Sequence, residues 1–247
     1  MQNIQLHRQM LPAGQVLLNE GGYLTQTTPF VVAPFMMGQF PVTNAEFAQF
    51  IAAAGYNTHI WWCETGWAGK EKWSWTEPLH WHNPHWNQPN CPVVGVSWYE
   101  AMAYCRWLTA ITGQTITLPT EQQWQRAAQG DDDRHYPWGN ADPDATLCNW
   151  NRHVDETTPV GHYPAGASPH GVMDMCGNVW EWCLTGWQSG TSEPIPGEQR
   201  LLRGGCWSSD SLMSLRAANR SPRDPNTRLA PQERHHVTVG FRWVCSG

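Results

Sequence analysis

The chain has 247 residues, a net charge of −6 and 15% charged residues, and it contains no basic run. That balance argues against a nucleic-acid-binding protein. Its 17 tryptophans, 22 glycines and 19 prolines predict a loop-rich fold in which rigid aromatic side chains fill the core. Because no change of composition marks a boundary, we expect a single domain over residues 1–247.

The first residues, Met1–Gln5, lack the basic and apolar segments of a signal peptide. No apolar run approaches the ~18 residues that span a membrane. Eight cysteines without a Cys-x-x-Cys spacing are expected to be buried thiols rather than disulfides or a zinc ribbon. We therefore expect a cytoplasmic protein that binds neither membranes nor nucleic acid.

Residues 14–42 alternate apolar segments with glycine and proline, which predicts an opening antiparallel sheet. The segment Thr43-Asn44-Ala45-Glu46 is a capping box, in which a hydroxyl and a carboxylate satisfy free amides at the start of a helix. The helix that follows carries Phe47 and Phe50 on one face, and we expect it to stop at Gly55.

Residues 56–92 hold seven tryptophans without a stable period, which predicts a long ordered insertion rather than a linker. Two further capping boxes follow. The first, Ser97–Glu100, predicts a helix that ends near Gly113, and the second, Thr120–Gln123, predicts a helix that ends near Gly130. The remainder is expected to consist of loops and short strands, so the fold class is α+β.

A polar, arginine-containing segment lies near the C-terminus between two apolar ends, Arg203–Trp207 and Val239–Val244. Both ends have the composition of short strands. Long irregular loops in compact domains are usually functional or disordered. Since a strand is expected on each side, we predict that the intervening segment is the working surface of the protein.

Several segments in this order resemble the sulfatase-modifying-factor family, which includes the formylglycine-generating enzymes. They are Gln39–Asn44, Pro92–Trp98, Leu118–Glu121, Tyr136–Asn140, Gly171–Trp182, Leu202–Gly205 and Gly240–Arg242. The resemblance covers nearly the whole chain. It implies a C-type-lectin-like fold with little regular secondary structure.

Formylglycine-generating enzymes of that family bind copper through two cysteines five residues apart, shortly after the Arg-Gly-Gly turn. Counting from Gly205 places Ser209 and Ser214 at these positions, whereas a different gap places Leu212 there. Between Gly205 and Gly240 the single thiol is Cys206. A thiolate pair is what suits Cu(I), so we expect no copper and doubt an oxidase activity.

Histidines offer another source of metal ligands at His80, His82 and His85 and at His235–His236. Related sulfoxide-forming enzymes hold iron with histidines from an additional helical domain, with a His-x-x-x-His-x-Glu pattern that this chain lacks. Pro84 also prevents a helical face from aligning the first three. We interpret all five as surface or satisfied histidines.

The segment Asp174–Glu181 is the better metal candidate, because calcium prefers carboxylate and carbonyl oxygens in a sharp turn. The resemblance implies a structural calcium held by Asp174 and Glu181 side chains and by the carbonyls of Gly177 and Val179. It also implies a second site beginning at Asn149 and Trp150, with Asp155 as a further donor. A turn stabilised without metal is the alternative at both places.

Neither a nucleophile elbow nor a phosphate-binding loop occurs in the chain. Arg216, Arg220 and Arg223 could pair with an anionic ligand, but arginines in such loops more often brace carbonyls and carboxylates. We therefore favour a structural role for these three.

These observations favour a ligand-binding protein that displays a surface loop, residues 206–236, on a calcium-braced scaffold. Its protein or other ligand would contact the 207–228 surface. The candidate contact residues are Trp207, Ser208, Ser209, Asp210, Ser211, Leu212, Met213, Ser214, Arg216, Asn219, Ser221 and Arg223. Small polar side chains give adaptable hydrogen bonds, while tryptophan and methionine give contact area.

In lacking the cysteine pair, the chain resembles one branch of the family, the variable proteins of diversity-generating retroelements. The alternatives are a formylglycine-generating or related metal-dependent oxidase acting on a protein cysteine, and an accessory interaction domain of a signalling or secretion system.

Overall fold

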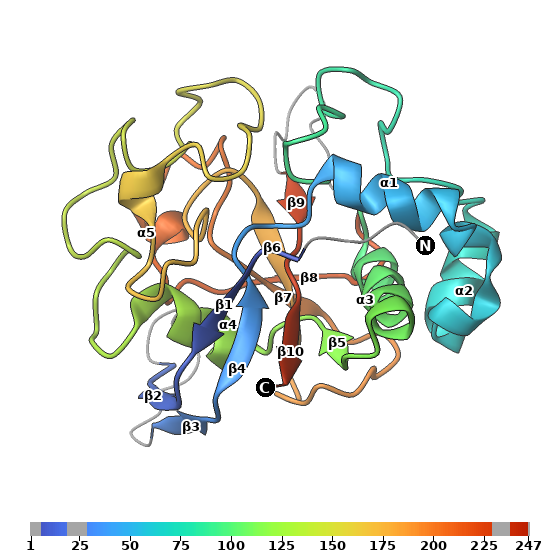
Figure 1. Ribbon diagram of the computed structural model, residues 1–247, viewed down its shortest axis with the longest axis horizontal. Coiled ribbons are helices and arrows are strands. Elements are labelled where there is room, and N and C mark those ends of the chain that lie inside the picture. The colour runs from blue at the N-terminus through green and yellow to red at the C-terminus, as the bar shows by residue number, and fades with distance from the viewer. Residues whose placement is uncertain (1–5, 19–28, 229–237, 247) are drawn as a thin grey trace.

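The computed structural model describes residues 6–18, 29–228 and 238–246. In this part of the chain the strands form two four-stranded sheets and a two-stranded ribbon, and long connections join them. Helices α1, α2 and α3 gather at one side of the sheets, while long loops and the short α5 lie at the opposite side (Figure 1). The predicted α+β, loop-rich architecture is confirmed. None of the helices within the described ranges has the length and apolar character needed to cross a membrane.

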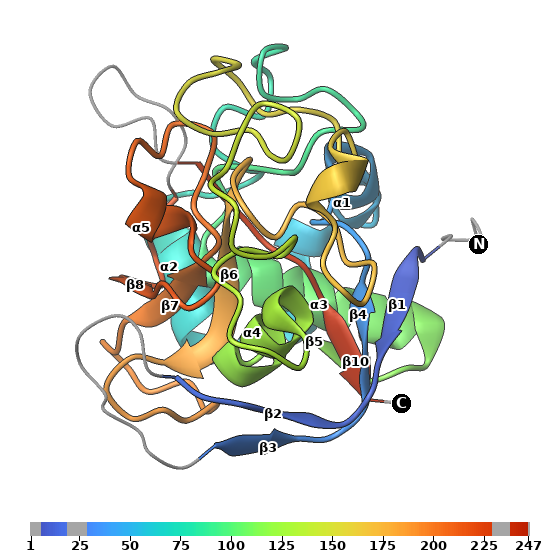
Figure 2. The same cartoon turned by 90° about the vertical axis from the view of Figure 1, so that its left-hand side faces the viewer.

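The first sheet joins the two ends of the chain. Its strands, in the order β1-β4-β10-β5, are Arg8–Leu11, Phe35–Gly38, Val244–Ser246 and Ile116–Thr117. All neighbours are antiparallel, with Met36 of β4 opposite both Met10 and Cys245. The ribbon of β2 (Gly14–Val16) and β3 (Phe30–Val32) extends from β1 and β4 (Figure 2). The predicted opening sheet therefore exists, but C-terminal β10 completes it.

The three predicted capping boxes all form. Helices α1 (Asn44–Ala52), α3 (Trp98–Thr112) and α4 (Glu121–Gln129) start after Thr43, Ser97 and Thr120, whose side chains accept from the N3 amides. Helices α3 and α4 end at glycines of positive φ, as predicted.

The predicted stop of the first helix at Gly55 is wrong. The cap of α1 is Ala53, and Ala54 takes the left-handed conformation. Gly55 is needed for another reason, because a Cβ there would lie 2.3 Å from the ring of Phe50.

The tryptophan-rich insertion is ordered, as predicted, and contains elements that the sequence did not indicate. They are the 3₁₀ turns η1 (Gly55–Asn57) and η2 (His59–Trp61) and helix α2 (Glu64–Lys72). The thiol of Cys63 caps α2 by accepting from Gly66 N at 3.4 Å. A Cβ at Gly66 would come within 2.9 Å of Tyr99, so this glycine lets α2 approach α3.

The second sheet carries the predicted working surface. Its order is β8-β7-β6-β9, with strands Ser221–Arg223, Arg200–Arg203, Trp180–Gly186 and Val239–Gly240. Here the predicted strand limits need correction. Strand β7 ends before the Gly204-Gly205 turn, and the C-terminal strand is divided into β9 and β10, with buried Arg242 in the stretch between them. A turn at Pro164–Gly166 (η3) and helix α5 (Leu212–Leu215) complete the elements.

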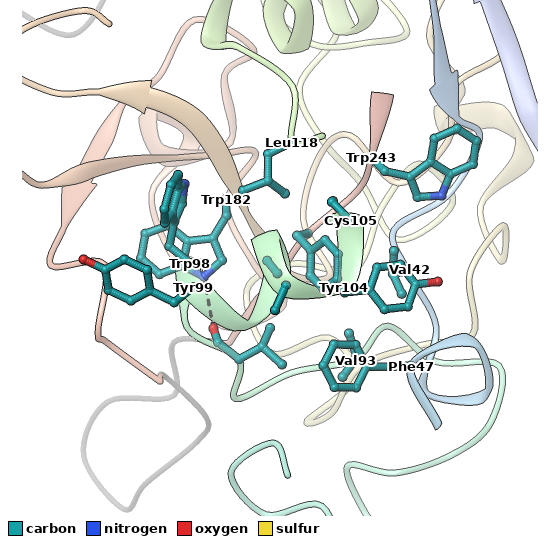
Figure 3. Packing of buried hydrophobic residues seen from close by; sticks show 14 of the residues in the cluster. Val42, Phe47, Val93, Trp98, Tyr99, Tyr104, Cys105, Leu118, Trp182 and Trp243 are labelled. Atoms are coloured by element: carbon teal, nitrogen blue, oxygen red, sulfur yellow. Dashed lines mark hydrogen bonds between the residues drawn. The ribbon is translucent and has the colours of Figure 1, made fainter. Parts of the chain in front are cut away.

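Indole rings fill the main core. Trp98 and Trp182 lie at one end of the largest cluster, and Phe47 and Val42 lie at the other (Figure 3). Two of the buried indoles in this cluster have backbone partners: Trp98 Nε1 donates to Cys183 O at 2.9 Å and Trp182 Nε1 donates to Val96 O at 3.0 Å. Such bonds remove the cost of burying the ring N–H. This explains how a small domain accommodates so many tryptophans.

Candidate functional site

The turn after β7 brings together two serines that the sequence analysis singled out. Gly204 and Gly205 have φ values of 94° and 75°. A Cβ on Gly205 would lie 3.0 Å from Ser214 O and 3.4 Å from Ser209 Oγ. Both serines therefore border one turn, whereas the alternative, Leu212, points outward with 38% exposure. The count that places Ser209 and Ser214 at the cysteine positions stays a prediction from the resemblance.

Hydroxyl groups, rather than a second thiol, surround Cys206. Its backbone N–H donates to Ser209 Oγ at 3.0 Å, and its sulfur lies 3.3 Å from Ser208 Oγ. Cys206 itself is 1% exposed. Across the described residues, no group of three or more histidine, cysteine, aspartate or glutamate side chains is arranged to hold a metal ion.

The predicted contact residues differ widely in exposure. Asp210, Ser211, Leu212 and Met213 are exposed. The half-buried ones are Ser208, Ser209, Ser214, Arg216, Asn219, Ser221 and Arg223. Residues 229–236 of the predicted loop lie outside the described residues. The exposed residues among the predicted contacts are thus consecutive, and residues 210–213 are called the tip below.

The expected role of Trp207 as a displayed contact is not supported by its position. Its side chain is 1% exposed and stacks on Trp86, with ring centroids 6.0 Å apart. The Arg152 guanidinium lies 5.9 Å from the indole centroid. Such burial makes Trp207 part of the support beneath the surface.

The arginines of the segment mainly brace it, as the sequence analysis favoured. Arg220 makes two hydrogen bonds to the Glu121 carboxylate, at 2.7 and 2.8 Å, and lies over the Trp187 ring. Arg216 makes a hydrogen bond with Tyr136, and Arg223 Nη1 donates to Pro222 O at 2.8 Å.

The far end of the segment is fixed by Arg228. Its guanidinium lies 3.1 Å from the buried carboxylate of Glu100 and over the Trp75 ring. Tyr56 donates a short 2.5 Å hydrogen bond to the same carboxylate. Burial raises the pKa of Glu100, while Arg228 and the Tyr56 hydrogen bond act in the opposite direction. Arg228 therefore ties the segment to the tryptophan-rich insertion.

The turn from Asp174 to Glu181 does not fit a calcium ion as its side chains lie. Both Glu181 oxygens accept from Arg242 at 2.6 Å, and Oε2 also accepts from Trp124 Nε1 at 2.8 Å. Asp174 accepts from Gly161 N at 2.7 Å, and burial raises its pKa to about 6. Calcium binds carboxylate oxygens whose lone pairs face the ion, whereas both Glu181 oxygens face Arg242, and one of them also faces Trp124. The buried ion pair braces the fold where calcium was predicted.

Gly177 and Val179, the predicted carbonyl donors, belong to the same turn. Gly177 has φ 75°, and a Cβ there would lie 2.2 Å from Asn149 O. Its N–H donates to Gly204 O at 2.9 Å, so the turn supports the Gly204-Gly205 region directly. Val179 is buried with Trp86 and Trp207.

At the second predicted calcium site, one side chain has a feature expected of a metal ligand. Asn149 is fully buried and its Oδ1 has no hydrogen-bond partner among the described residues, while Nδ2 donates to Glu156 O at 2.8 Å. Trp150 is half-buried and Asp155 is exposed. One amide oxygen is compatible with a cation, but the residues described around it supply no cluster of charged ligands.

The predicted assignment to the surface agrees with the contacts of His82 and His85, whereas His80 is half-buried and its Nε2 has no hydrogen-bond partner among the described residues. His82 Nε2 lies 3.0 Å from Glu77, and His85 Nδ1 lies 3.2 Å from Glu156. His80 adopts a positive φ of 63°. His235 and His236 lie outside the described residues.

Two cavities were not indicated by the sequence. One of about 280 Å³ is lined by His7, Phe40, Pro41, Thr43, Glu46, Asn90, Val160 and Trp243. The other, of about 140 Å³, lies beside the acidic loop Asp131–Asp133. Neither is lined by the predicted surface segment.

The structure also brings two thiols together that no spacing pattern had linked. Cys148 and Cys176 are 28 residues apart in the chain, and their sulfurs lie 3.8 Å apart. Both are buried with Tyr136 and Leu215, and Cys176 Sγ lies 3.5 Å from Leu215 O. Cys176 directly precedes Gly177, whose N–H donates to Gly204 O, and Cys148 directly precedes Asn149, whose carbonyl lies against Gly177.

Comparisons with known proteins show the family of the chain. A family model described as sulfatase-modifying factor enzyme 1-like domain matches residues 5–246. The chain is 38% identical over 205 residues to a hercynine oxygenase of Mycolicibacterium thermoresistibile, which covers 71% of this chain and 44% of that protein. It is 30% identical over 212 residues to inactive C-alpha-formylglycine-generating enzyme 2 of Mus musculus, covering 71% of this chain and 64% of that protein.

Among solved structures, variable protein 1 of Treponema denticola superposes with a TM-score of 0.69 at 19% identity, covering 100% of this chain and 97% of that one. At that identity the likeness concerns the fold alone. The chain spans less than half of the hercynine oxygenases that it matches. With the family model covering nearly every residue, the chain belongs to the sulfatase-modifying factor enzyme 1-like family, that of the formylglycine-generating enzymes, and has its α+β, C-type-lectin-like fold.

Proposed function

We propose that this chain is a ligand-binding domain that presents residues 206–228 to a protein partner. One observation carries the proposal: Ser209 and Ser214 border the Gly205 turn, and the family resemblance implies that these are the positions of the two copper-binding cysteines in the formylglycine-generating enzymes. Hydroxyl groups do not replace thiolates as ligands for a soft, redox-active metal. They can, however, donate and accept hydrogen bonds from a bound partner.

The backbone beneath the surface is held in place before any ligand arrives. Asn151 N donates to Ser209 O at 2.9 Å, and Arg152 N donates to Trp207 O at 2.8 Å. The buried Arg220–Glu121 pair fixes the following stretch. Preorganisation lowers the conformational entropy lost on binding, so it favours affinity.

The chemistry of the tip supports a protein as the partner. Leu212 and Met213 expose 38% and 52% of their surface, and Asp210 and Ser211 lie next to them. An apolar centre with a polar rim is typical of protein interfaces, and methionine adapts to differently shaped surfaces. A variable protein of a diversity-generating retroelement is one form of this proposal, and a template repeat beside a reverse transcriptase gene would support it.

A random peptide library displayed on phage tests the surface. We expect the selected peptides to bind the Met213→Asp variant at least about tenfold more weakly than the wild type, since a charge would be buried at the contact. Ile60→Asp is the matched control, because Ile60 is 72% exposed on η2 and lies outside the segment. Peptides that bind wild type and Met213→Asp equally would refute the proposed surface.

A second candidate function is that of a ligand-binding domain in an oxygenase whose metal ligands lie outside this chain. It is supported by the 38% identity to a hercynine oxygenase and by the match to only 44% of that protein. In this reading another domain or chain supplies the iron-binding histidines. Isolating the chain together with any partner from its source cells, loading that preparation with Fe(II) or Cu(I) and measuring bound metal and oxygen consumption separates the two. Stoichiometric metal with oxygen uptake would replace the first proposal.

We propose a reducing, cytoplasmic location, because all eight cysteines are free and seven of them are buried. An accessory interaction domain of a signalling or secretion system would use the same 210–213 tip. Co-purification of a defined partner whose binding is lost in Met213→Asp would identify that role.

A further inference from the structure

Cys148 and Cys176 form a close thiol pair inside the molecule. Their sulfurs lie 3.8 Å apart, and each residue is 3% exposed. Tyr136 and Leu215 complete the buried cluster around them. Two sulfurs at this distance are in van der Waals contact, and a disulfide needs an approach to about 2.05 Å.

The backbone beside both cysteines is already paired. Asn178 N donates to Asn149 O at 2.9 Å, and the missing side chain of Gly177 lets this carbonyl approach. The residues that follow each cysteine therefore touch, so the remaining approach of the sulfurs falls mainly on their side chains. Disulfides form only where two backbones are this close.

The pair is connected to the surface of the molecule. Cys176 Sγ lies 3.5 Å from the carbonyl oxygen of Leu215, the last residue of α5. In the reduced protein the thiol donates a hydrogen bond to that carbonyl. A disulfide sulfur carries no proton, so oxidation removes this donor at the end of α5.

We propose that Cys148 and Cys176 form a reversible disulfide that alters the support of the exposed 210–213 tip. Oxidation by a low-molecular-weight disulfide proceeds by exchange. One thiolate attacks the reagent and releases a first thiol, and the second cysteine attacks the resulting mixed disulfide and releases another. One S–S bond forms in the protein, two S–H bonds are lost, and both protons and both electrons end on the two released thiols.

Access to the buried pair requires local opening of the loop that follows Cys148, which breaks the Asn151 N–Ser209 O and Arg152 N–Trp207 O hydrogen bonds. Asn151, Arg152 and His153 are exposed, and the first two have positive φ values of 49° and 56°. A segment of this kind opens locally at a lower free energy than the core does. The inference does not depend on any ligand of the proposed binding surface.

The experiment equilibrates the full chain in glutathione buffers of increasing oxidised fraction, blocks free thiols in denaturant and maps disulfides by mass spectrometry. We expect a loss of two hydrogens, about 2 Da, assigned to a Cys148–Cys176 cross-link. Cys148→Ala and Cys176→Ala should each abolish it, while Cys105→Ala, a buried cysteine of α3, should not.

Hydrogen exchange tests the consequence. Amides of residues 206–216 should change their protection on oxidation of the wild type and remain unchanged in Cys148→Ala. The mapping on wild type requires no variant, so a variant that fails to fold does not obscure the result. Cross-links confined to other cysteines, mixed glutathione adducts only, or unaltered exchange on oxidation would overturn the proposal.

Discussion

Arg242 and Glu181 provide the sharpest test of what holds this fold together. Both side chains are fully buried, and the guanidinium makes two 2.6 Å hydrogen bonds to the carboxylate. Arg242 also donates to Met173 O at 2.9 Å and to Gly38 O at 3.2 Å. The perturbation is Arg242→Met, which keeps an apolar stem of similar length and removes every one of these donors.

The expected loss is large because Glu181 would remain as a buried charge with Trp124 as its remaining donor. Removing one partner of a buried pair costs about 3–5 kcal/mol. For a chain of this length that corresponds to a fall in Tm of about 6–20 °C. Adding Glu181→Gln to Arg242→Met should restore part of this stability, since no unpaired charge then remains.

The assay is thermal unfolding followed by circular dichroism, with and without EDTA. Arg134→Met is the matched control, because Arg134 pairs with Asp132 at a similarly short distance, 2.7 Å, but at the surface. Surface pairs contribute about 0–1 kcal/mol, so its Tm should fall by no more than about 4 °C. If both variants lose the same amount, the buried pair is not the brace. If EDTA lowers the wild-type Tm and Glu181→Gln abolishes that effect, Glu181 is a calcium ligand after all.

Three further changes test other parts of the reasoning. Burial raises the folded-state pKa of Asp174 to about 6 from 3.8, so protonation stabilises the fold below the lower value and this contribution is lost as pH rises through 6. Asp174→Asn should therefore gain up to about 3 kcal/mol above pH 6 in urea unfolding; destabilisation seen only with Ca²⁺ present would instead mark a metal ligand. Ser97→Ala removes the cap of α3 and should cost about 1 kcal/mol in the same assay, whereas an unchanged midpoint would show that the capping bond contributes little. Ser209→Cys/Ser214→Cys should bind one Cu(I) in a competition titration, unlike either single variant, if these serines occupy the thiolate positions.

Local signals in the sequence were sufficient for the main helices. Thr43, Ser97 and Thr120 each carry a capping partner three residues on, and all three begin a helix. Such signals act within one turn of the chain, so they can be recognised without knowing the neighbours. Helix α2 was missed because its cap is the thiol of Cys63, a residue type that rarely serves this role.

The position of the candidate surface could be predicted from the sequence, but the exposure of its individual residues could not. The Arg-Gly-Gly turn and the serines after it were recognisable, and in the structure Ser209 Oγ and the backbone oxygen of Ser214 both lie close to Gly205. Trp207 was expected at the surface because tryptophan often contacts ligands. Its burial against Trp86 depends on a segment more than a hundred residues earlier, which no local pattern reports.

The sequence by itself determined the family, the loop-rich α+β class, the caps and the missing cysteine pair, because these depend on residue identity and short spacings. Tertiary structure alone decided that Glu181 faces Arg242 instead of an open cation site. It also decided that the sulfurs of Cys148 and Cys176 meet. Both outcomes depend on side chains brought together from distant segments, where a buried charge requires its nearest opposite charge and a packed core fixes which thiols touch.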